Sequence, residues 1–184
     1  MKLWRVARAA YSASGRDASN GIGGLSVDGR WHTRGRLIVY TARTESLAKL
    51  EALVHLKPAI APRLVLVEAT IPDALVATLH GALPAGWDDV PDSGSARSGG
   101  DSWLQGGSSL ALEVPSLHSR SETNVLINPA HPDFAQLVIG NPVAARAAPA
   151  WRCVAAVVKI SFTGVRFRAL SERRPGSYLW ERLR

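Results

Sequence analysis

The stretch Asp28-Gly-Arg-Trp-His-Thr-Arg-Gly-Arg-Leu-Ile-Val-Tyr-Thr-Ala-Arg-Thr-Glu-Ser-Leu-Ala-Lys-Leu-Glu51 decides the fold that the sequence predicts. It opens with an Asp-Gly pair, which is a frequent turn signal. Residues 37–40 are β-branched and aromatic enough to predict a buried strand. A helix is expected to begin at Thr44 as its N-cap and to end near residues 55–57, because Pro58 disfavours helical geometry in the residue before it.

One face of this predicted helix carries an acidic residue among apolar ones. At about 100° per residue, the residues on that face are Leu47, Leu50, Glu51 and Val54. Glu51 is the only carboxylate there, and a buried carboxylate is costly unless it is paired, hydrogen-bonded or open to a pocket. A salt bridge to a nearby arginine and a functional site are both open explanations at this point.

Composition bounds the class of protein. A chain of 184 residues favours a single domain, and 46% hydrophobic with 20% charged residues is ordinary for a soluble globular protein. No apolar run approaches the roughly 18–20 residues of a membrane-spanning helix, and the basic N-terminus lacks the apolar centre of a signal peptide. The single cysteine, Cys153, excludes an intrachain disulfide and a cysteine-rich zinc site. We therefore expect a protein of the reducing cytoplasm with no membrane partner.

The net charge of +7 is confined to one end of the chain. Residues 1–140 contain 13 Lys and Arg against 13 Asp and Glu, whereas residues 141–184 contain 9 against 2. A neutral body argues against nucleic-acid binding by the core. The basic end is either a solvated tail or a segment that binds an acidic partner or a nucleic acid. It is treated as a C-terminal extension whose order and role stay open.

The rest of the chain alternates short strands with polar loops. Strands are predicted at residues 3–7, 63–71, 110–116, 125–127, 137–139 and 153–162. Residues 74–80 fit either a strand or a short helix. A long loop is expected over residues 12–24, and residues 81–109 are expected to be surface loops with one helical turn around Trp103.

Familiar catalytic and metal motifs do not explain the chain. The five histidines are scattered without a His-x-x-x-His pair, so no metal site is predicted. No Gly-x-Ser-x-Gly segment is present, and Ser116 has no adjacent base in the sequence. A ribonuclease-like pair of His118 and Arg120 has no diagnostic spacing.

Four polar residues remain as the candidate site, namely Arg30, Tyr40, Glu51 and Ser116. They suit a ligand that is both aromatic and phosphorylated, because arginine forks onto phosphate oxygens and tyrosine stacks on a flat ring. A glutamate binds ribose hydroxyls or stabilises an oxocarbenium-like ribose as a glycosidic bond breaks. Spacing alone leaves this as a hypothesis.

An ordered series of short motifs over residues 1–140 resembles the RES-domain family, toxins of bacterial toxin–antitoxin pairs. The matching segments are Leu3-Trp-Arg-Val, Gly29-Arg-Trp with Gly35, Tyr40-Thr-Ala, Ala48-Lys-Leu-Glu51, Leu83-Pro-Ala-Gly-Trp87, Gly100-Asp-Ser-Trp103, Val114-Pro-Ser116 and Asn128-Pro-Ala-His-Pro-Asp-Phe134. By this resemblance the family's arginine, tyrosine, glutamate and serine fall on the four candidate residues. The chain departs from the family pattern at Val125, where an aromatic residue is common, and in residues 141–184, for which no family motif is matched.

The resemblance implies an α+β fold similar to ADP-ribosyltransferases, with a compact mixed sheet and flanking helices. It also implies an enzyme that takes NAD+ as substrate, without a separate cofactor, and cleaves the nicotinamide–ribose bond by hydrolysis or by phosphorolysis. Phosphate would be the co-substrate in the second case. The implied partner is an Xre-type antitoxin that masks the cleft.

The resemblance also implies a role for each site residue. Arg30 would hold the phosphates and Tyr40 would pack on the nicotinamide or ribose. Glu51 would stabilise the ribosyl cation, and Ser116 would position the ribose or the attacking group. ADP-ribosyl transfer to a protein is the alternative within the family. A non-enzymatic protein that binds nucleic acid through residues 141–184 is the alternative outside it.

Overall fold

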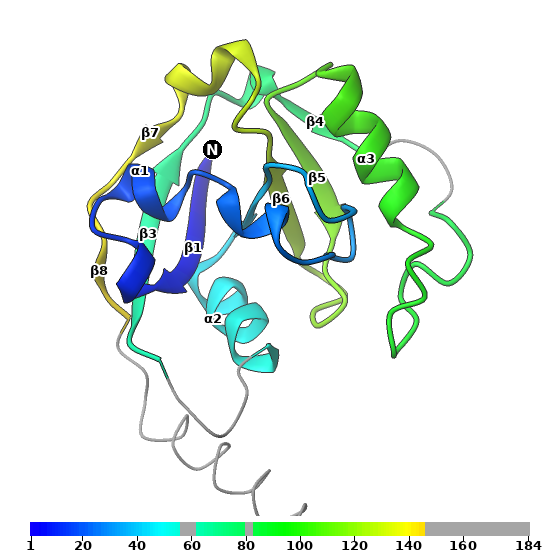
Figure 1. Ribbon diagram of the computed structural model, residues 1–184, viewed down its shortest axis with the longest axis horizontal. Helices are drawn as coiled ribbons and strands as arrows, with labels where there is room; N and C mark the ends of the chain where they lie inside the picture. Colours follow the sequence, from blue (N-terminus) through cyan, green and yellow to red (C-terminus); the bar gives the residue numbers. More distant parts are fainter. Residues whose placement is uncertain (56–61, 80–82, 146–184) are drawn as a thin grey trace, which may run out of the picture.

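A curved β-sheet is the centre of the protein (Figure 1). The structure is a computed structural model that describes residues 1–55, 62–79 and 83–145. Its strands are β1 (Lys2–Arg8), β2 (Val39–Ala42), β3 (Leu64–Thr70), β4 (Val76–Thr78), β5 (Ala111–Pro115), β6 (Thr123–Ile127), β7 (Val138–Ile139) and β8 (Val143–Ala144). Their order in the sheet is β4-β5-β6-β2-β1-β3-β7, and β8 also pairs with β3.

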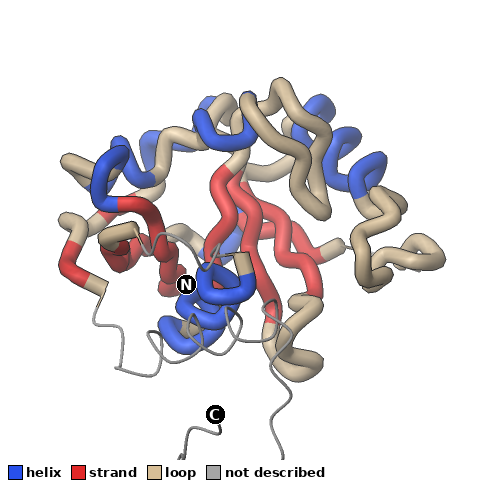
Figure 2. Tube along the Cα trace, turned by 60° about the horizontal axis from the view of Figure 1, so that its bottom comes forward, coloured by secondary structure: helices blue, strands red, loops and turns tan. Residues whose placement is uncertain are grey.

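Short helices flank this sheet (Figure 2). The α-helices of the described residues are α1 (Gly15–Ala18), α2 (Glu45–Val54) and α3 (Arg97–Gly106). The 3-10 helices are η1 (Ala9–Tyr11), η2 (Ile22–Leu25), η3 (Asp73–Leu75) and η4 (Pro132–Gln136). A mixed sheet with flanking helices confirms the predicted α+β class.

The pairing of the strands explains why the chain needs its long turn-rich segment. β1 is antiparallel to β3 along its whole length, from Lys2 opposite Thr70 to Arg8 opposite Leu64. Only β4 and β5 pair in parallel, within the described residues. Parallel strands cannot be joined by a tight hairpin and need a crossover. The segment between them supplies this crossover and contains α3, which lies beside the β4–β5 edge (Figure 1).

Apolar side chains cover both faces of the β5–β6 half of the sheet. Val125 and Ile127 belong to one core cluster, and Leu126 between them belongs to another, as the alternation of a strand requires. Trp103 of α3 and Trp31 join the second cluster. The helix approaches so closely that a Cβ on Gly100 would lie 1.8 Å from the Trp31 carbonyl oxygen. Only glycine fits this contact.

Helix α2 begins where predicted, but the face that it buries differs from the predicted face. Thr44 is the N-cap, and its side chain accepts a hydrogen bond from the Leu47 backbone. Leu47 and Ala48 are buried against β1 and β2, whereas Leu50 and Val54 are 37% and 46% exposed. The prediction that Leu50 and Val54 point inward was therefore wrong. The helix ends at Val54, one residue before the predicted end region, of which only residue 55 is described.

Other element boundaries shifted because tertiary packing overrides local preference. β2 lies two residues later than the predicted strand at 37–40. The predicted loop at 12–24 contains α1, which a capping box between Ser14 and Asp17 stabilises. The predicted single turn around Trp103 is the ten-residue α3. Its glycines disfavour a helix in isolation, and burial of the tryptophan compensates.

The remaining strand predictions are mostly confirmed. β1, β3 and β5 lie where the sequence places them, and β6 begins two residues earlier than predicted. Residues 74–79 combine the end of η3 with β4. β7 is an edge strand and not a core strand, because Val138 is 69% exposed. The register places Val138 opposite Thr70 at the end of β3.

Most of the basic extension, including the predicted strand at 153–162, lies outside the described residues. Its first residues form β8, which pairs with β3 through Val143 and Leu66. The sheet therefore continues past residue 140. Among the described helices, none is long and apolar enough to cross a membrane.

Candidate active site

A cleft of about 480 Å³ lies between α2, the centre of the sheet and the segment that precedes β2. Arg30, Tyr40 and Glu51 all line it. The fold thus brings together three residues that the sequence predicted as one site. The fourth, Ser116, is buried behind the wall of the cleft next to Glu51.

Glu51 is held by hydrogen bonds and not by an arginine. Its Oε1 accepts a hydrogen bond of 2.8 Å from Ser116 Oγ and one of 2.7 Å from Asn124 Nδ2. Its Oε2 lies 3.8 Å from His118 Nε2. Among the ion pairs of the described residues, none joins Glu51 to an arginine. The carboxylate therefore has one anchored oxygen and one that is open toward the cleft.

Ser116 acts on Glu51 from behind. Its hydroxyl donates to Glu51 and accepts from the backbone N–H groups of His118 and Ser119, at 3.1 and 3.2 Å. These contacts use the hydroxyl hydrogen and both lone pairs. Ser116 is thus placed to orient the carboxylate and to fold the loop after β5. The predicted role, positioning the ribose or the attacking group, stays a prediction.

The loop after β5 is tied to α2 at a second point. Glu122 accepts hydrogen bonds from Thr44 Oγ1 at 2.6 Å and from Ser119 Oγ at 2.8 Å. These two hydroxyls, Thr44 first, hold the pKa of Glu122 below its usual value. These hydrogen bonds therefore join the N-terminus of α2 to the segment that carries Ser116 and support the position of Glu51 relative to its partners.

Tyr40 is positioned through its hydroxyl. The oxygen lies 2.8 Å from His32 Nδ1 and accepts a hydrogen bond from the Trp31 backbone N–H. Burial raises the pKa of Tyr40, so the phenol is neutral at physiological pH. A Cβ on Gly29 would lie 2.5 Å from this hydroxyl and from the His32 ring. Glycine at position 29 therefore leaves room for the tyrosine hydroxyl and the His32 ring.

Arg30 is held by a neighbouring loop. Its Nη1 and Nη2 donate to the backbone carbonyls of Trp87 and Asp89, and Nη1 lies 3.6 Å from the Asp92 carboxylate. A guanidinium has five N–H donors, so these contacts leave part of the fork available. The side chain is only 18% exposed. Arg30 is the predicted phosphate-binding residue, and a phosphate would compete with Asp92 for it.

Arg5 is a second cationic residue of the cleft, and sequence reasoning did not assign it to the site. It lies on β1 and donates to the Ala18 carbonyl at 2.6 Å and to the Tyr40 carbonyl at 2.9 Å. Burial lowers its pKa to about 10, which leaves it charged at physiological pH. A charged residue in the middle of a predicted apolar strand was the signal that would have found it.

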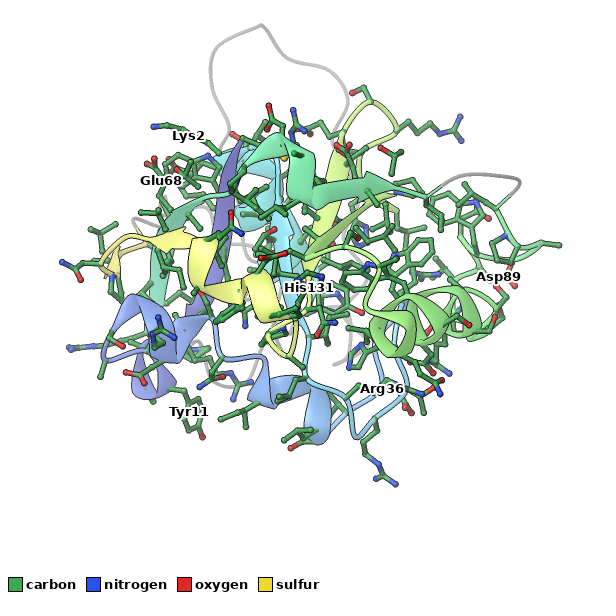
Figure 3. All side chains as sticks on the ribbon, turned by 90° about the horizontal axis from the view of Figure 1, so that it is seen from above. Lys2, Tyr11, Arg36, Glu68, Asp89 and His131 are labelled. Atoms are coloured by element: carbon green, nitrogen blue, oxygen red, sulfur yellow. The ribbon has the colours of Figure 1, made fainter. Side chains whose placement is uncertain are left out.

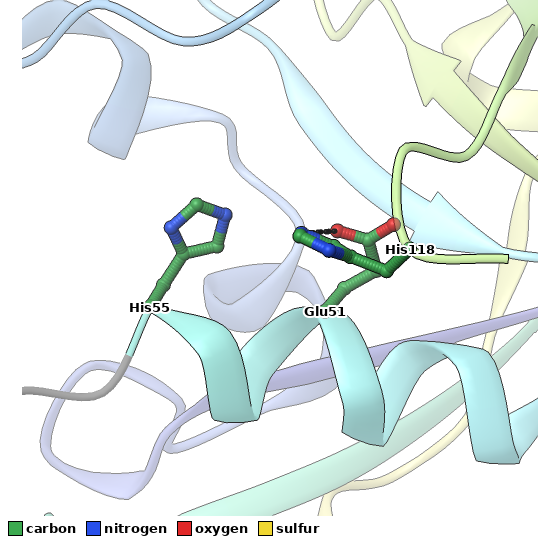
Figure 4. A group of neighbouring side chains, drawn as sticks. All are labelled: Glu51, His55 and His118. Carbon is green, nitrogen blue, oxygen red and sulfur yellow. Dashed lines mark ion pairs between the residues drawn. The ribbon is translucent and has the colours of Figure 1, made fainter. Parts of the chain in front are cut away.

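His55 and His118 also gather around Glu51 (Figure 4), as does Asn124 through its hydrogen bond. His55 follows α2, and His118 lies in the loop after β5, so only the fold brings the two rings to 6.5 Å. The sequence predicted no site at the histidines because they are scattered along the chain. For Asn124, the signal was its place directly before Val125, where the chain departs from the family pattern.

Further charged groups lie both in the cleft and outside it, and Asp28 and Asp92 also line the cleft. Figure 3 shows Lys2 and Glu68 beside each other at one end of the sheet, and Asp89 at the opposite end near α3. His131 belongs to η4, which its side chain caps.

Glu51 and the two arginines, Arg5 and Arg30, line one cleft. Together they can bind a ligand that carries an electron-poor centre at one end and anionic groups at the other.

The chain matches a known family over most of its length. A family model of the RES domain matches residues 2–155. The chain belongs to the RES-domain family. This confirms the predicted resemblance, and it places the Glu51 cleft within the part of the chain that this family shares.

Relatives of this RES-domain protein carry toxin names. It is 42% identical over 136 residues to the Prs ADP-ribosylating toxin of Sphingobium sp. (strain YBL2), covering 71% of this chain and 84% of that protein. It is 42% identical over 135 residues to Toxin Res of Pseudomonas putida, covering 72% and 87%. It is 34% identical over 136 residues to Toxin Res of Yersinia enterocolitica, covering 73% and 88%.

The fold is also similar to a solved structure, the M. tuberculosis MbcT–MbcA toxin–antitoxin complex. The TM-score is 0.64 at 17% sequence identity, with 84% of this chain and 88% of the other covered. At this identity the similarity concerns the fold alone. It agrees with the mixed sheet and flanking helices described above.

Proposed function

We propose that this RES-domain protein is an NAD+-degrading toxin of a bacterial toxin–antitoxin pair, which cleaves the nicotinamide–ribose bond. The observation that carries the proposal is the half-anchored carboxylate of Glu51 in a cleft that also contains two arginines. NAD+ has the complementary charges, with a cationic nicotinamide–ribose end and an anionic pyrophosphate. The toxin names of the relatives support the same function.

Loss of nicotinamide leaves positive charge on the ribose carbon and its ring oxygen. A carboxylate oxygen that is already oriented stabilises this charge without reorganising in the transition state. Ser116 and Asn124 hold Glu51 Oε1 and direct Oε2 into the cleft. Glu51 is the catalytic residue of the proposed reaction, and Ser116 and Asn124 are positioning residues.

The opposite part of the cleft would bind the pyrophosphate. Arg30 offers a planar fork that matches phosphate oxygens, and Arg5 adds a desolvated positive charge. Tyr40 lines the same cleft, and its hydroxyl lies 2.8 Å from His32 Nδ1. We assign it to packing on the nicotinamide or the ribose.

The acceptor of the ADP-ribosyl group defines two variants of this function. In the first, water or inorganic phosphate attacks the ribose carbon after nicotinamide leaves, so that ADP-ribose or its 1-phosphate forms. In the second, a nucleophile of a target protein takes the ADP-ribosyl group. The second variant has support of its own, because one relative, 42% identical, is named an ADP-ribosylating toxin.

We also propose an antitoxin as the partner, since the structural neighbour is a toxin–antitoxin complex. An Xre-type protein from a neighbouring gene is the expected class. Its binding would close the cleft that holds Glu51 and so suppress NAD+ cleavage. Co-purification with the product of the adjacent gene, and loss of activity in the complex, would test this pairing.

The deciding experiment incubates the purified protein with NAD+, with and without inorganic phosphate, and follows nicotinamide release. Nicotinamide should appear, and phosphate dependence should separate phosphorolysis from hydrolysis. A parallel incubation with NAD+ labelled on its adenylate and a cell lysate tests transfer to a protein. Unchanged NAD+ in all arms, or full activity in Glu51→Ala, would sink the assignment.

A further inference from the structure

Glu51, His55 and His118 form a cluster of metal-ligand type at the mouth of the cleft (Figure 4). One carboxylate oxygen and one ring nitrogen from each histidine lie within 4.8 Å of one another. A tetrahedral Zn²⁺ with bonds of about 2.0–2.1 Å needs ligand atoms roughly 3.3–3.5 Å apart. His118 Nε2 and Glu51 Oε2 are at 3.8 Å, so a bound ion would draw these two atoms and the His55 ring nitrogen closer together.

The backbone favours this convergence. Glu51 and His55 are four residues apart, which places both on the same side of α2. His118 reaches them from the loop after β5. The backbone N–H of His118 donates a hydrogen bond to Ser116 Oγ, which fixes this part of the loop. His55 is the C-cap of α2, and the carbonyl end of a helix favours a positive charge. The exposed His55 ring is free to turn toward an ion.

The hydrogen bonds of Glu51 also match those of a metal ligand. Ligating carboxylates are commonly oriented by hydrogen bonds to their other oxygen. Here Ser116 Oγ and Asn124 Nδ2 both occupy Oε1, so Oε2 alone faces the two histidines. A monodentate bond through Oε2 would leave these two hydrogen bonds unchanged.

We propose that Glu51, His55 and His118 bind one divalent transition-metal ion of the Zn²⁺ class, and that this ion inhibits the enzyme. Two imidazoles and one carboxylate suit Zn²⁺, Co²⁺ or Ni²⁺ and not Mg²⁺ or Ca²⁺, which prefer oxygen ligands. The fourth coordination position remains for water. The inhibitory part rests on the proposed function, because the ion takes the carboxylate oxygen that would stabilise the ribosyl cation.

Calorimetric titration of the metal-free protein with Zn²⁺ tests the site without reference to catalysis. One ion per chain should bind, and Mg²⁺ should not compete. His55→Gln and His118→Gln should each weaken binding at least about tenfold, the smaller end of the losses seen even for outer-shell partners. His131→Gln, a histidine that caps η4 away from the cluster, is the matched control and should bind as the wild type does.

The second arm measures nicotinamide release at increasing Zn²⁺, with each variant compared with its own metal-free rate. Zn²⁺ should inhibit the wild type in proportion to occupancy, a chelator should restore the rate, and His55→Gln should need at least about tenfold more Zn²⁺. Equal Zn²⁺ affinity in wild type, His55→Gln and His118→Gln overturns the site. Full occupancy without inhibition overturns its regulatory role. If the wild type proves inactive on NAD+, only the proposed function fails, and the calorimetric result still decides the site.

Discussion

The two sides of the cleft hold their charges in opposite ways. On the Glu51 side, side chains from β6 and from the loop after β5 fix one carboxylate oxygen, and the other is open. On the Arg30 side, two backbone carbonyls and Asp92 already contact the guanidinium and leave part of its donors available. The open oxygen of Glu51 has no such competitor, whereas a phosphate would compete with Asp92 for Arg30. In the proposed function, the chemistry would therefore depend on the packing around Glu51, and the affinity on the loop that holds Arg30.

The largest expected effect comes from removing the charge on the rigid side. Glu51→Gln keeps the shape and a hydrogen-bond acceptor but loses the charge that would stabilise the ribosyl cation. We expect kcat for nicotinamide release to fall about 100- to 1,000-fold, as for other preorganised electrostatic groups. Glu45→Gln, an acidic residue of the same helix paired with Lys49, is the control and should keep the wild-type rate. Equal rates in both variants would show that Glu51 is not catalytic.

A smaller effect should follow from loosening Glu51 without changing its charge. Ser116→Ala leaves two backbone N–H groups without their acceptor, which costs about 1–3 kcal/mol in the free energy of unfolding. Because Glu51 is then less well oriented, we expect kcat to fall roughly tenfold, or about 1.4 kcal/mol, while KM for NAD+ stays within about twofold. Chemical denaturation and steady-state kinetics measure the two effects. A rise in KM alone would place Ser116 in substrate binding instead.

The histidine between the two sides should make stability depend on pH. Burial lowers the pKa of His32, and its Nε2 has no hydrogen-bond partner within the described residues. Above pH 6.5 the ring is neutral in both the folded and the unfolded chain, so its contribution is constant. Below pH 6.5 the unfolded chain takes up the proton first, so stability falls with falling pH, by at most about 1.4 kcal/mol per pH unit. The melting temperature of His32→Gln should depend less on pH between about 5 and 6.5 than that of the wild type.

The smallest expected effect is on the loop side. Asp92→Asn weakens two partly exposed ion pairs of Asp92, one with Arg97 at 2.6 Å and one with Arg30 at 3.6 Å, and the second pair would compete with the pyrophosphate. Such pairs contribute about 0.2–1 kcal/mol, so KM for NAD+ should fall roughly 1.5- to 5-fold at unchanged kcat. Asp88→Asn makes the same change of charge at an exposed residue of the same loop and is the control. If both variants lower KM equally, the effect comes from net charge and not from release of Arg30.

Sequence patterns predicted the local features of the fold and missed those that depend on tertiary packing. The helix start at Thr44 and the strand around Val125 were predictable, because capping and alternation are local properties. The inward face of α2 was not, since Leu50 and Val54 fit the periodicity as well as Ala48 does. Which of them is buried depends on how the helix lies on β1 and β2.

The candidate site divides in a similar way. Resemblance to the RES-domain family was enough to name Arg30, Tyr40, Glu51 and Ser116. It did not show that Ser116 lies behind the cleft, nor that Arg5, 46 residues before Glu51 in the chain, contributes a charge to it. A periodic pattern cannot reveal such pairs, because it describes neighbours within one element.

The sequence by itself determined the family and the α+β class, and it named Glu51 as the carboxylate of the candidate site. The tertiary structure alone decided what that carboxylate contacts. Its partners Ser116, His118 and Asn124 follow it by 65, 67 and 73 positions, and the pairing of β5, β6 and β2 brings them to α2. Long-range strand pairing sets those distances, and the same pairing gives Glu51 one anchored oxygen and one free oxygen.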